Sequence, residues 1–335
     1  MMLRRAALKL VGACALLAGV GLSGTAQAGE VIKIGTLAPK SSPWGQVFSV
    51  WADAVAKKSD GKVELQFFYN GQQGDEDAMV GKMKSGQLDG AAVTGVGLSK
   101  IYKPILALQM PGLFRTWAKL DAARDAMKGE FEKGVSDAGF TISGWGDVGL
   151  AHLMSKGFAI NVPDDIKGKK PYMWRADDVA PILFQVIGGV TPVPLNVTEV
   201  LPNLNTGAIN IVTAPALAAE QLQWASKLDT IVSDVAGIGI GALVFSSKRL
   251  AALPEDLRSI VTDTGKVASA ALTKRIRNED AAAYARLTAP GKMTVVNLTD
   301  DQKAKWAAVF QQTRDRLKQG TFSPDLVNRL EALAK

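Results

Sequence analysis

The stretches SGQLDGAAVT (85–94) and TGAINIVT (206–213) repeat one pattern in the two halves of the chain. Each reads as the end of a helix, a glycine and then a strand, because glycine suits the left-handed conformation just past a helix. Ligands of open α/β sheets bind beyond the carboxyl ends of strands. The repeat therefore predicts two similar lobes whose threonines, Thr94 and Thr213, face a shared cleft. The same order of elements is also common in α/β proteins that have no such symmetry.

The segments around the first repeat favour an α/β fold. Residues 31–37 and 63–68 read as strands, and Ser42 with Pro43 marks the start of a helix between them. This alternation predicts parallel strands covered by helices. From Pro254 to about residue 287 only Gly265 interrupts a helical pattern, which predicts a helix of about 50 Å. We expect that helix to bridge the two lobes, with Val267 among the apolar residues on its buried side.

The segment after the second repeat reads as another helix start. Pro215 is expected at the first helical position. The free amides of that helix would face the cleft, where they could accept a negative group or a carbonyl group.

The N-terminal residues have the layout of a cleaved secretory signal. Basic residues precede an apolar run of about a dozen residues, and Ala28 ends a small-residue cleavage pattern. A membrane span needs about 20 residues, so a retained anchor is the less favoured alternative. Export by the Sec or the twin-arginine route stays open. Cys14, the only cysteine, lies in this segment as an incidental residue or an acylated anchor, so a chain cleaved after Ala28 has no cysteine chemistry.

The charge and length set further bounds. The chain has 39 Lys and Arg against 32 Asp and Glu, and residues 1–28 hold three of the bases and none of the acids, which leaves 36 minus 32, or +4. This mild surplus predicts no nucleic-acid partner and no membrane-surface partner. About 300 remaining residues predict two domains.

Little in the sequence supports catalysis. His152 is the only histidine, and it is more typical of a structural or cleft-lining residue than of a general base. The stretch GIGIG (237–241) leads into a strand instead of a helix, so it does not fit a dinucleotide loop. We expect no catalytic residue and no metal site. Aromatic residues instead gather at predicted loops and strand ends, where they could line a pocket or fill the core.

Five stretches resemble one known family, the substrate-binding (P) subunits of TRAP transporters, which are DctP-like extracellular solute receptors. They are IKIG (32–35), PW (43–44), KSGQLDG (84–90), PGLF (111–114) and LNTG (204–207). The resemblance implies two α/β lobes around a ligand cleft, braced by a long helix, in the periplasm. It also implies delivery of a solute to a small and a large membrane subunit, with no cofactor and no chemistry.

The chain departs from that family where specificity is set. Relatives place an arginine that grips a ligand carboxylate, whereas GKKPY (168–172) puts Tyr172 at that position. Trp174 follows, and Arg175 is displaced by three residues. These departures resemble a subgroup that includes receptors paired with a TPR-repeat periplasmic protein, whose pockets are thought to favour apolar ligands.

The sequence thus predicts a receptor for a small organic solute that is largely apolar. Alternatives are a carboxylate receptor using Arg175, or Lys169 or Lys170, and an enzyme on a similar scaffold. Lobe I is expected to comprise 29–148 and 237–277, and lobe II 149–236 and 278–335. The expected ligand-binding residues are Trp44, Gln72, Thr94, Phe114, Trp145, His152, Tyr172, Trp174, Arg175, Thr213, Pro215 and Trp224.

Overall fold

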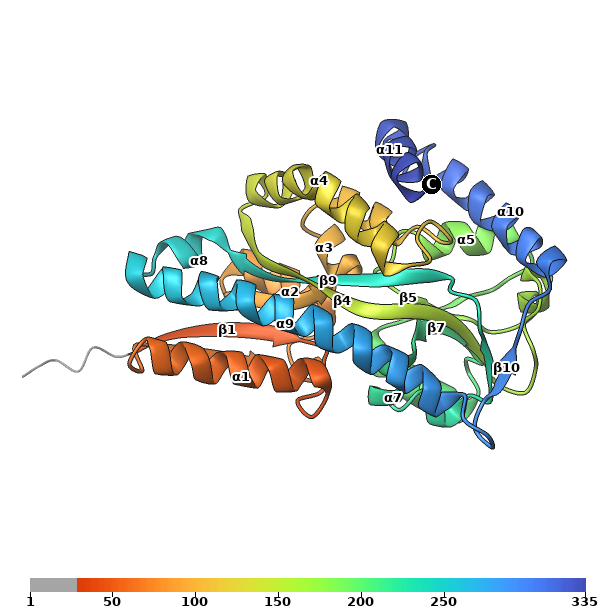
Figure 1. The fold of residues 1–335 in the computed structure, drawn as a ribbon, viewed down its shortest axis with the longest axis horizontal. Coiled ribbons are helices and arrows are strands. Elements are labelled where there is room, and N and C mark those ends of the chain that lie inside the picture. The colour runs from red at the N-terminus through yellow and green to blue at the C-terminus, as the bar shows by residue number, and fades with distance from the viewer. Residues whose placement is uncertain (1–28) are drawn as a thin grey trace, which may run out of the picture.

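The computed structural model describes residues 29–335. The predicted signal segment 1–28, Cys14 and the cleavage position after Ala28 lie outside the described residues. Figure 1 shows helices packed on both sides of a long twisted sheet.

The strand, helix, strand unit predicted near the start of the chain is confirmed. It consists of β1 (Glu30–Thr36), α1 (Pro43–Lys58) and β2 (Val63–Phe68). β1 pairs in parallel with β2 and with β3 (Gly90–Thr94). Ser42 caps α1 by accepting a 3.2 Å hydrogen bond from the Gly45 amide.

One eight-stranded sheet runs through the whole molecule in the order β10-β8-β4-β9-β3-β1-β2, with β7 also paired to β4. Its remaining strands are β4 (Phe140–Ser155), β7 (Ile211–Pro215), β8 (Thr230–Val232), β9 (Gly237–Ser246) and β10 (Thr294–Val296). β4 pairs antiparallel with β9 along its first part and with β7 along its last part. These two long antiparallel strands carry the sheet from one lobe into the other. The sequence predicted a strand after residue 241, which lies within β9, but it did not predict β4.

The repeated pattern has the predicted geometry in both lobes. α2 (Glu76–Ser85) ends at Gly86 with φ 77°, and α6 (Val197–Thr206) ends at Gly207 with φ 71°. Both glycines are left-handed, as the helix ends require. β3 and β7 follow these two helices.

The long helix is α9 (Glu255–Leu287), whose 33 residues span about 50 Å. It packs along β4 and contacts both α1 and α7, so it braces the two lobes (Figure 1). A Cβ atom added at Gly144 of β4 would overlap Ser269 of α9, so small residues set this close approach. The expectation for Val267 is wrong, because its side chain is 71% exposed and the buried face follows Gly265 and Ser269 instead.

The other elements complete the two lobes. They are α3 (Gly95–Ser99), α4 (Trp117–Asp137), β5 (Tyr172–Trp174), α5 (Ala180–Ile187), β6 (Val193–Leu195), α7 (Ala216–Gln221), α8 (Ser247–Ala251), α10 (Asp300–Leu317) and α11 (Pro324–Ala334), with short 3₁₀ turns at Lys103–Gln109, Pro163–Ile166 and Ala225–Lys227. β5 and β6 form a separate parallel pair. Among residues 29–335, no helix is both long enough and apolar enough to cross a membrane.

Candidate functional site

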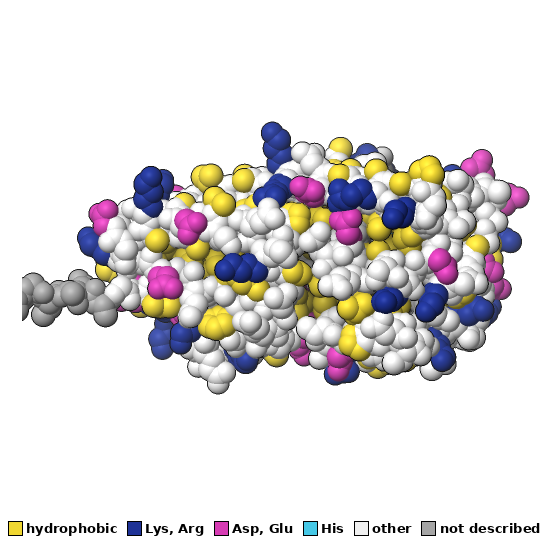
Figure 2. Space-filling view, turned by 90° about the horizontal axis from the view of Figure 1, so that it is seen from below, with side chains coloured by type: hydrophobic (Ala, Val, Ile, Leu, Met, Phe, Trp, Pro, Cys, Tyr) yellow, Lys and Arg dark blue, Asp and Glu magenta, His cyan; other side chains and the backbone are white. Residues whose placement is uncertain are grey.

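A cavity of about 200 Å³ lies between the two lobes. Its walls come from the β1–α1 loop, β3, β4 and β9 on one side, from β5, α6, β7 and α7 on the other, and from the middle of α9. In the space-filling view, hydrophobic side chains show at the junction between the half that carries the N-terminus and the opposite half (Figure 2). We call this cavity the cleft.

Most of the expected site residues line this cleft. They are Trp44, Thr94, Trp145, Tyr172, Trp174, Thr213, Pro215 and Trp224. The structure therefore brings together aromatic residues that are up to 180 positions apart in the sequence (Trp44 and Trp224, 224 minus 44). The repeat-derived pair Thr94 and Thr213 faces the cleft from the two lobes, as predicted from the sequence.

Three other expected residues lie elsewhere for identifiable reasons. Gln72 is exposed in the loop after β2. Phe114 is 1% exposed and packs in the hydrophobic core beside α4. His152 is buried on β4, where its Nδ1 lies 3.0 Å from the Val232 carbonyl oxygen and its ring packs against Tyr284. Burial lowers the pKa of the His152 imidazole, which favours a neutral structural residue.

The basic residues that a carboxylate ligand would need also lie outside the cleft. Arg175 is half-exposed, and its Nη2 donates a 3.1 Å hydrogen bond to Glu199. The Lys169 ammonium lies 4.5 Å from the centre of the Phe158 ring, and Lys170 is exposed. None of the described residues that line the cleft is Lys, Arg or His.

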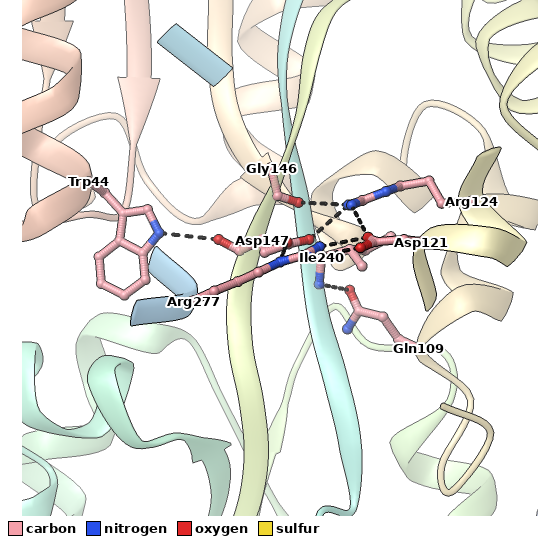
Figure 3. A network of polar contacts seen from close by, with 8 residues as sticks. All are labelled: Trp44, Gln109, Asp121, Arg124, Gly146, Asp147, Ile240 and Arg277. Atoms are coloured by element: carbon pink, nitrogen blue, oxygen red, sulfur yellow. Dashed lines mark hydrogen bonds and ion pairs between the residues drawn. The ribbon is translucent and has the colours of Figure 1, made fainter. Parts of the chain in front are cut away.

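Two arginines come close to the cleft and are both held by carboxylates (Figure 3). The buried side chain of Asp147 on β4 accepts 2.8 Å and 2.7 Å hydrogen bonds from Arg124 and Arg277. Asp121 on α4 binds the same two guanidinium groups, at 2.9 Å from Arg124 and at 2.6 and 2.7 Å from Arg277. Since two carboxylates match two guanidinium groups, this network offers no spare charge to a ligand. It also pins α4 and α9 to β4.

The acidic side chain at the cleft floor of lobe I is also neutralised. Glu76 accepts 2.7 Å hydrogen bonds from the amides of Thr94 and Gly97, and a 2.8 Å bond from the Thr94 hydroxyl. Burial raises the pKa of the Glu76 carboxyl to about 8. At neutral pH the group is therefore mostly protonated, and it already occupies the amides at the start of α3.

A matching arrangement in lobe II overturns one expectation. Pro215 is the last residue of β7, and α7 begins one residue later at Ala216. The Leu217 amide, one of those expected to be free at this helix start, is occupied, because it donates a 3.0 Å hydrogen bond to Asp280 of α9. The second oxygen of Asp280 accepts a 2.8 Å bond from the Leu150 amide. Asp280 therefore takes up part of this helix start from within the protein.

Two polar atoms on the cleft wall are buried without a partner. Among residues 29–335, the hydroxyl groups of Tyr172 and Ser269 make no hydrogen bond. The buried hydroxyl of Ser143 also makes none with any of these residues. The Tyr172 ring packs edge-on against Trp224 at 5.9 Å, and burial raises its pKa well above the usual value, so the phenol is neutral. Buried polar groups in native proteins are almost always hydrogen-bonded. These hydroxyls are therefore the groups that a ligand would satisfy.

Sequence reasoning missed several residues of the cleft. Glu76 reads as a helix-start acid, and its place under Thr94 depends on the fold of α2 against α3. Ser269 and Leu272 lie in the middle of α9 and line the cleft. A signal for these two was present, since a helix that bridges two lobes presents the middle of its length to the space between them.

The lining of the cleft is dominated by groups that suit binding. Among the described residues, no group of three or more His, Cys, Asp or Glu side chains could hold a metal ion. The available groups are aromatic faces, aliphatic side chains, neutral hydroxyls and the carboxamide of Gln221. Two lobes, a bracing helix and a cleft of this kind define a two-lobed solute-binding protein.

The chain belongs to the DctP family, the bacterial extracellular solute-binding proteins of family 7, whose family model matches residues 34–319. It is 24% identical over 323 residues to a solute-binding protein of Sulfitobacter sp. strain NAS-14.1, a match that covers 95% of this chain and 96% of that one. A solute-binding protein of Chromohalobacter salexigens is 26% identical over 196 residues, which cover 58% of this chain and 57% of that protein.

Solved structures share the fold. The TRAP periplasmic solute-binding protein of Sulfurospirillum deleyianum, with bound succinate, superposes with a TM-score of 0.84 at 22% identity, covering 91% of this chain and 99% of that one. The sugar acid binding protein of Advenella mimigardefordensis, in complex with galactonate, gives 0.84 at 19% identity, covering 91% and 98%. The family and the fold expected from the sequence are confirmed, and the protein is a solute-binding receptor, not an enzyme.

Proposed function

We propose that this receptor serves a TRAP-type transporter in the periplasm and captures a small, uncharged, largely apolar organic solute between its lobes. It then delivers the solute to a small and a large membrane subunit. The observation that supports the apolar ligand is the charge inventory of the cleft. No basic side chain lines it among the described residues, and the nearby Arg124 and Arg277 are held by Asp121 and Asp147.

Binding would rest on aromatic area and one polar contact. Trp44, Trp174 and Trp224 contribute large apolar surfaces to the cleft, and each stacking contact adds about 0.5–1.5 kcal/mol beyond the area that it buries. The unpartnered Tyr172 hydroxyl would donate to a carbonyl or hydroxyl oxygen of the solute. The Ser269 hydroxyl is a second candidate for that role. Thr94, Trp145, Thr213 and Pro215 complete this proposed site.

An acid such as the succinate or galactonate seen in the structural relatives would be disfavoured here. Burying a carboxylate costs free energy unless a positive charge or several hydrogen-bond donors contact it. The carboxylate alternative would need Arg175 to leave Glu199 and enter the cleft. The apolar ligand needs no such rearrangement.

The lobes would close by bending where chain segments cross between them. We place lobe I at 29–148 and 237–277, and lobe II at 149–236 and 278–335. β9 begins at Gly237, and the break in the β4–β9 register between Asp147 and Gly149 falls at the same boundary. Scattering that shows no compaction when the solute binds would contradict this division.

Two finer assignments come from the sequence, one from the layout of residues 1–28 and one from the subgroup resemblance. We propose cleavage of the signal after Ala28, which N-terminal sequencing of the exported protein tests. We also propose a TPR-repeat periplasmic partner, since the apolar cleft fits the subgroup that has one. Cross-linking in intact cells should trap a TPR-repeat protein, and recovery of the membrane subunits alone would contradict this partner.

Calorimetry separates the two ligand classes. A straight-chain methyl ketone, as the probe of an uncharged apolar solute, should bind the wild-type protein, and succinate should not. Arg175→Ala should leave ketone binding unchanged. Tight succinate binding that Arg175→Ala abolishes would overturn the proposal in favour of a carboxylate receptor.

A further inference from the structure

A second cavity, also of about 200 Å³, lies behind the cleft. Its walls come from α5, α10, β4, β7, the start of β9 and the loops before α4 and α5. The two cavities share only three lining residues, which are Tyr172, Trp174 and Thr213. These three side chains therefore form the wall between them. We call this second space the rear cavity.

The lining of the rear cavity is mostly apolar, with Asp177 as the one acidic side chain that residues 29–335 contribute to it. Leu183 and Phe184 of α5 line it together with Trp306 and Phe310 of α10. The carboxyl group of Asp177 accepts a 2.7 Å hydrogen bond from the Val179 amide, and burial raises its pKa. Like the cleft, the rear cavity has no Lys, Arg or His among the described residues that line it.

The rear cavity is partly open to solvent, so water covers its apolar lining when no ligand is bound. Moving apolar surface from water into contact with an apolar ligand group is favourable, at about 25 cal/mol per Å². A hydrocarbon group of a ligand would therefore be stabilised in this space.

Two side chains of the dividing wall, Trp174 and Tyr172, differ in their hydrogen bonding. The Trp174 indole is fixed by a 3.1 Å hydrogen bond to Asp75. The Tyr172 hydroxyl has no partner, so rotation of that side chain breaks no hydrogen bond. Thr213 is exposed and adds little obstruction. Tyr172 is thus placed to move aside and to bind the polar atom of a ligand that passes it.

We propose that the two cavities form one binding site, in which the polar group of a long solute binds at Tyr172 and its hydrocarbon tail extends past Tyr172 into the rear cavity. This inference rests on the proposed apolar function and specifies its substrate class as elongated molecules with a single uncharged polar group.

Two filling variants test the inference with a series of straight-chain methyl ketones of increasing length. Ala180→Phe places a ring in the rear cavity, whereas the matched Ala218→Phe places one in the cleft. In the wild-type protein, affinity should rise about fourfold for each added methylene group beyond the length that the cleft holds. Ala180→Phe should abolish that rise and leave the short ketones unaffected, and Ala218→Phe should weaken the whole series.

The possible outcomes separate this inference from the proposed function. If short ketones bind and the increase with chain length survives Ala180→Phe, the rear cavity is not part of the site. If no ketone binds at all, the proposed function fails with it. A crystal of the wild-type protein with a terminally brominated ketone gives an answer that does not depend on the variants. Bromine beside Leu183 supports the inference, and bromine within the cleft overturns it.

Discussion

The indole Nε1 of Trp174 donates a 3.1 Å hydrogen bond to Oδ1 of Asp75. Asp75 caps α2 in lobe I, whereas Trp174 belongs to β5 in lobe II. The second oxygen of Asp75 accepts a 2.8 Å bond from the amide of Val197, the first residue of α6. One buried carboxylate therefore joins the helix starts of both lobes and orients an aromatic wall of the cleft.

Asp75→Ala should loosen the closed arrangement of the lobes. Hydrogen bonds to a charged group contribute about 1.5–3 kcal/mol each, and the change removes those from Trp174 and Val197. Small-angle scattering of the ketone-bound variant should show a larger radius of gyration than the ketone-bound wild type, with weaker ketone binding in calorimetry. Unchanged scattering and affinity would mean that Asp75 only caps its own helix.

Trp174→Ala should weaken binding of the solute by about 2 kcal/mol or more, or roughly 30-fold, because it removes a large apolar wall. Val50→Ala is the matched control, since Val50 is 68% exposed on α1 and does not line the cleft. Calorimetry of both variants with the same ligand decides the question. Equal affinities would place the pocket elsewhere.

Stability should depend on pH through Glu76. Its pKa is about 8 in the folded protein against a usual value of 4.5, so the folded chain holds a proton that the unfolded chain releases. The stabilising effect is complete below pH 4.5 and is lost as pH rises toward 8, at no more than about 1.4 kcal/mol per pH unit.

Denaturant unfolding of the wild type and of Glu76→Gln over this pH range isolates that effect. His152, whose pKa is lowered, acts in the opposite direction and is common to both proteins. The difference in unfolding free energy between wild type and variant should shrink with rising pH. A difference that stays constant would show that Glu76 is already ionised in the folded protein.

Tyr172→Arg should give the cleft an affinity for carboxylates. The tyrosine stands where the family resemblance places a carboxylate-binding arginine, and charge-assisted hydrogen bonds of that kind contribute about 1.5–3 kcal/mol, or roughly 10–100-fold. Succinate binding should become measurable, while Tyr172→Phe should show none. If Tyr172→Arg folds normally and still ignores succinate, position 172 does not correspond to that arginine.

The sequence predicted those parts of the structure that local chemistry determines. Gly86 and Gly207 end helices because only a residue without a side chain accepts the left-handed conformation easily, so the two lobes could be read from their repeat. The length of α9 followed from the near absence of breakers. The aromatic wall was found because several aromatic residues gather at predicted loops and strand ends, although Phe114 of that set fills the core instead.

What the sequence did not predict depends on contacts between distant elements. Asp280 accepts a hydrogen bond from the Leu217 amide, which is 63 residues away in the sequence. The sequence around α7 therefore gave no sign that this amide has a partner. The small residues of α9 that lie close to β4 determine which side of the helix is buried. The apolar residues of the helix, which include the exposed Val267, do not indicate that side. Arg175 lies outside the cleft because it pairs with Glu199, which is 24 residues away in the sequence.

The most direct test of the apolar ligand is the identity of the solute that the protein carries. Native mass spectrometry of gently purified protein, followed by release and mass analysis of the bound compound, measures it. A cleft without basic side chains predicts an uncharged compound that is mostly hydrocarbon. Release of a dicarboxylate or a sugar acid would contradict the account.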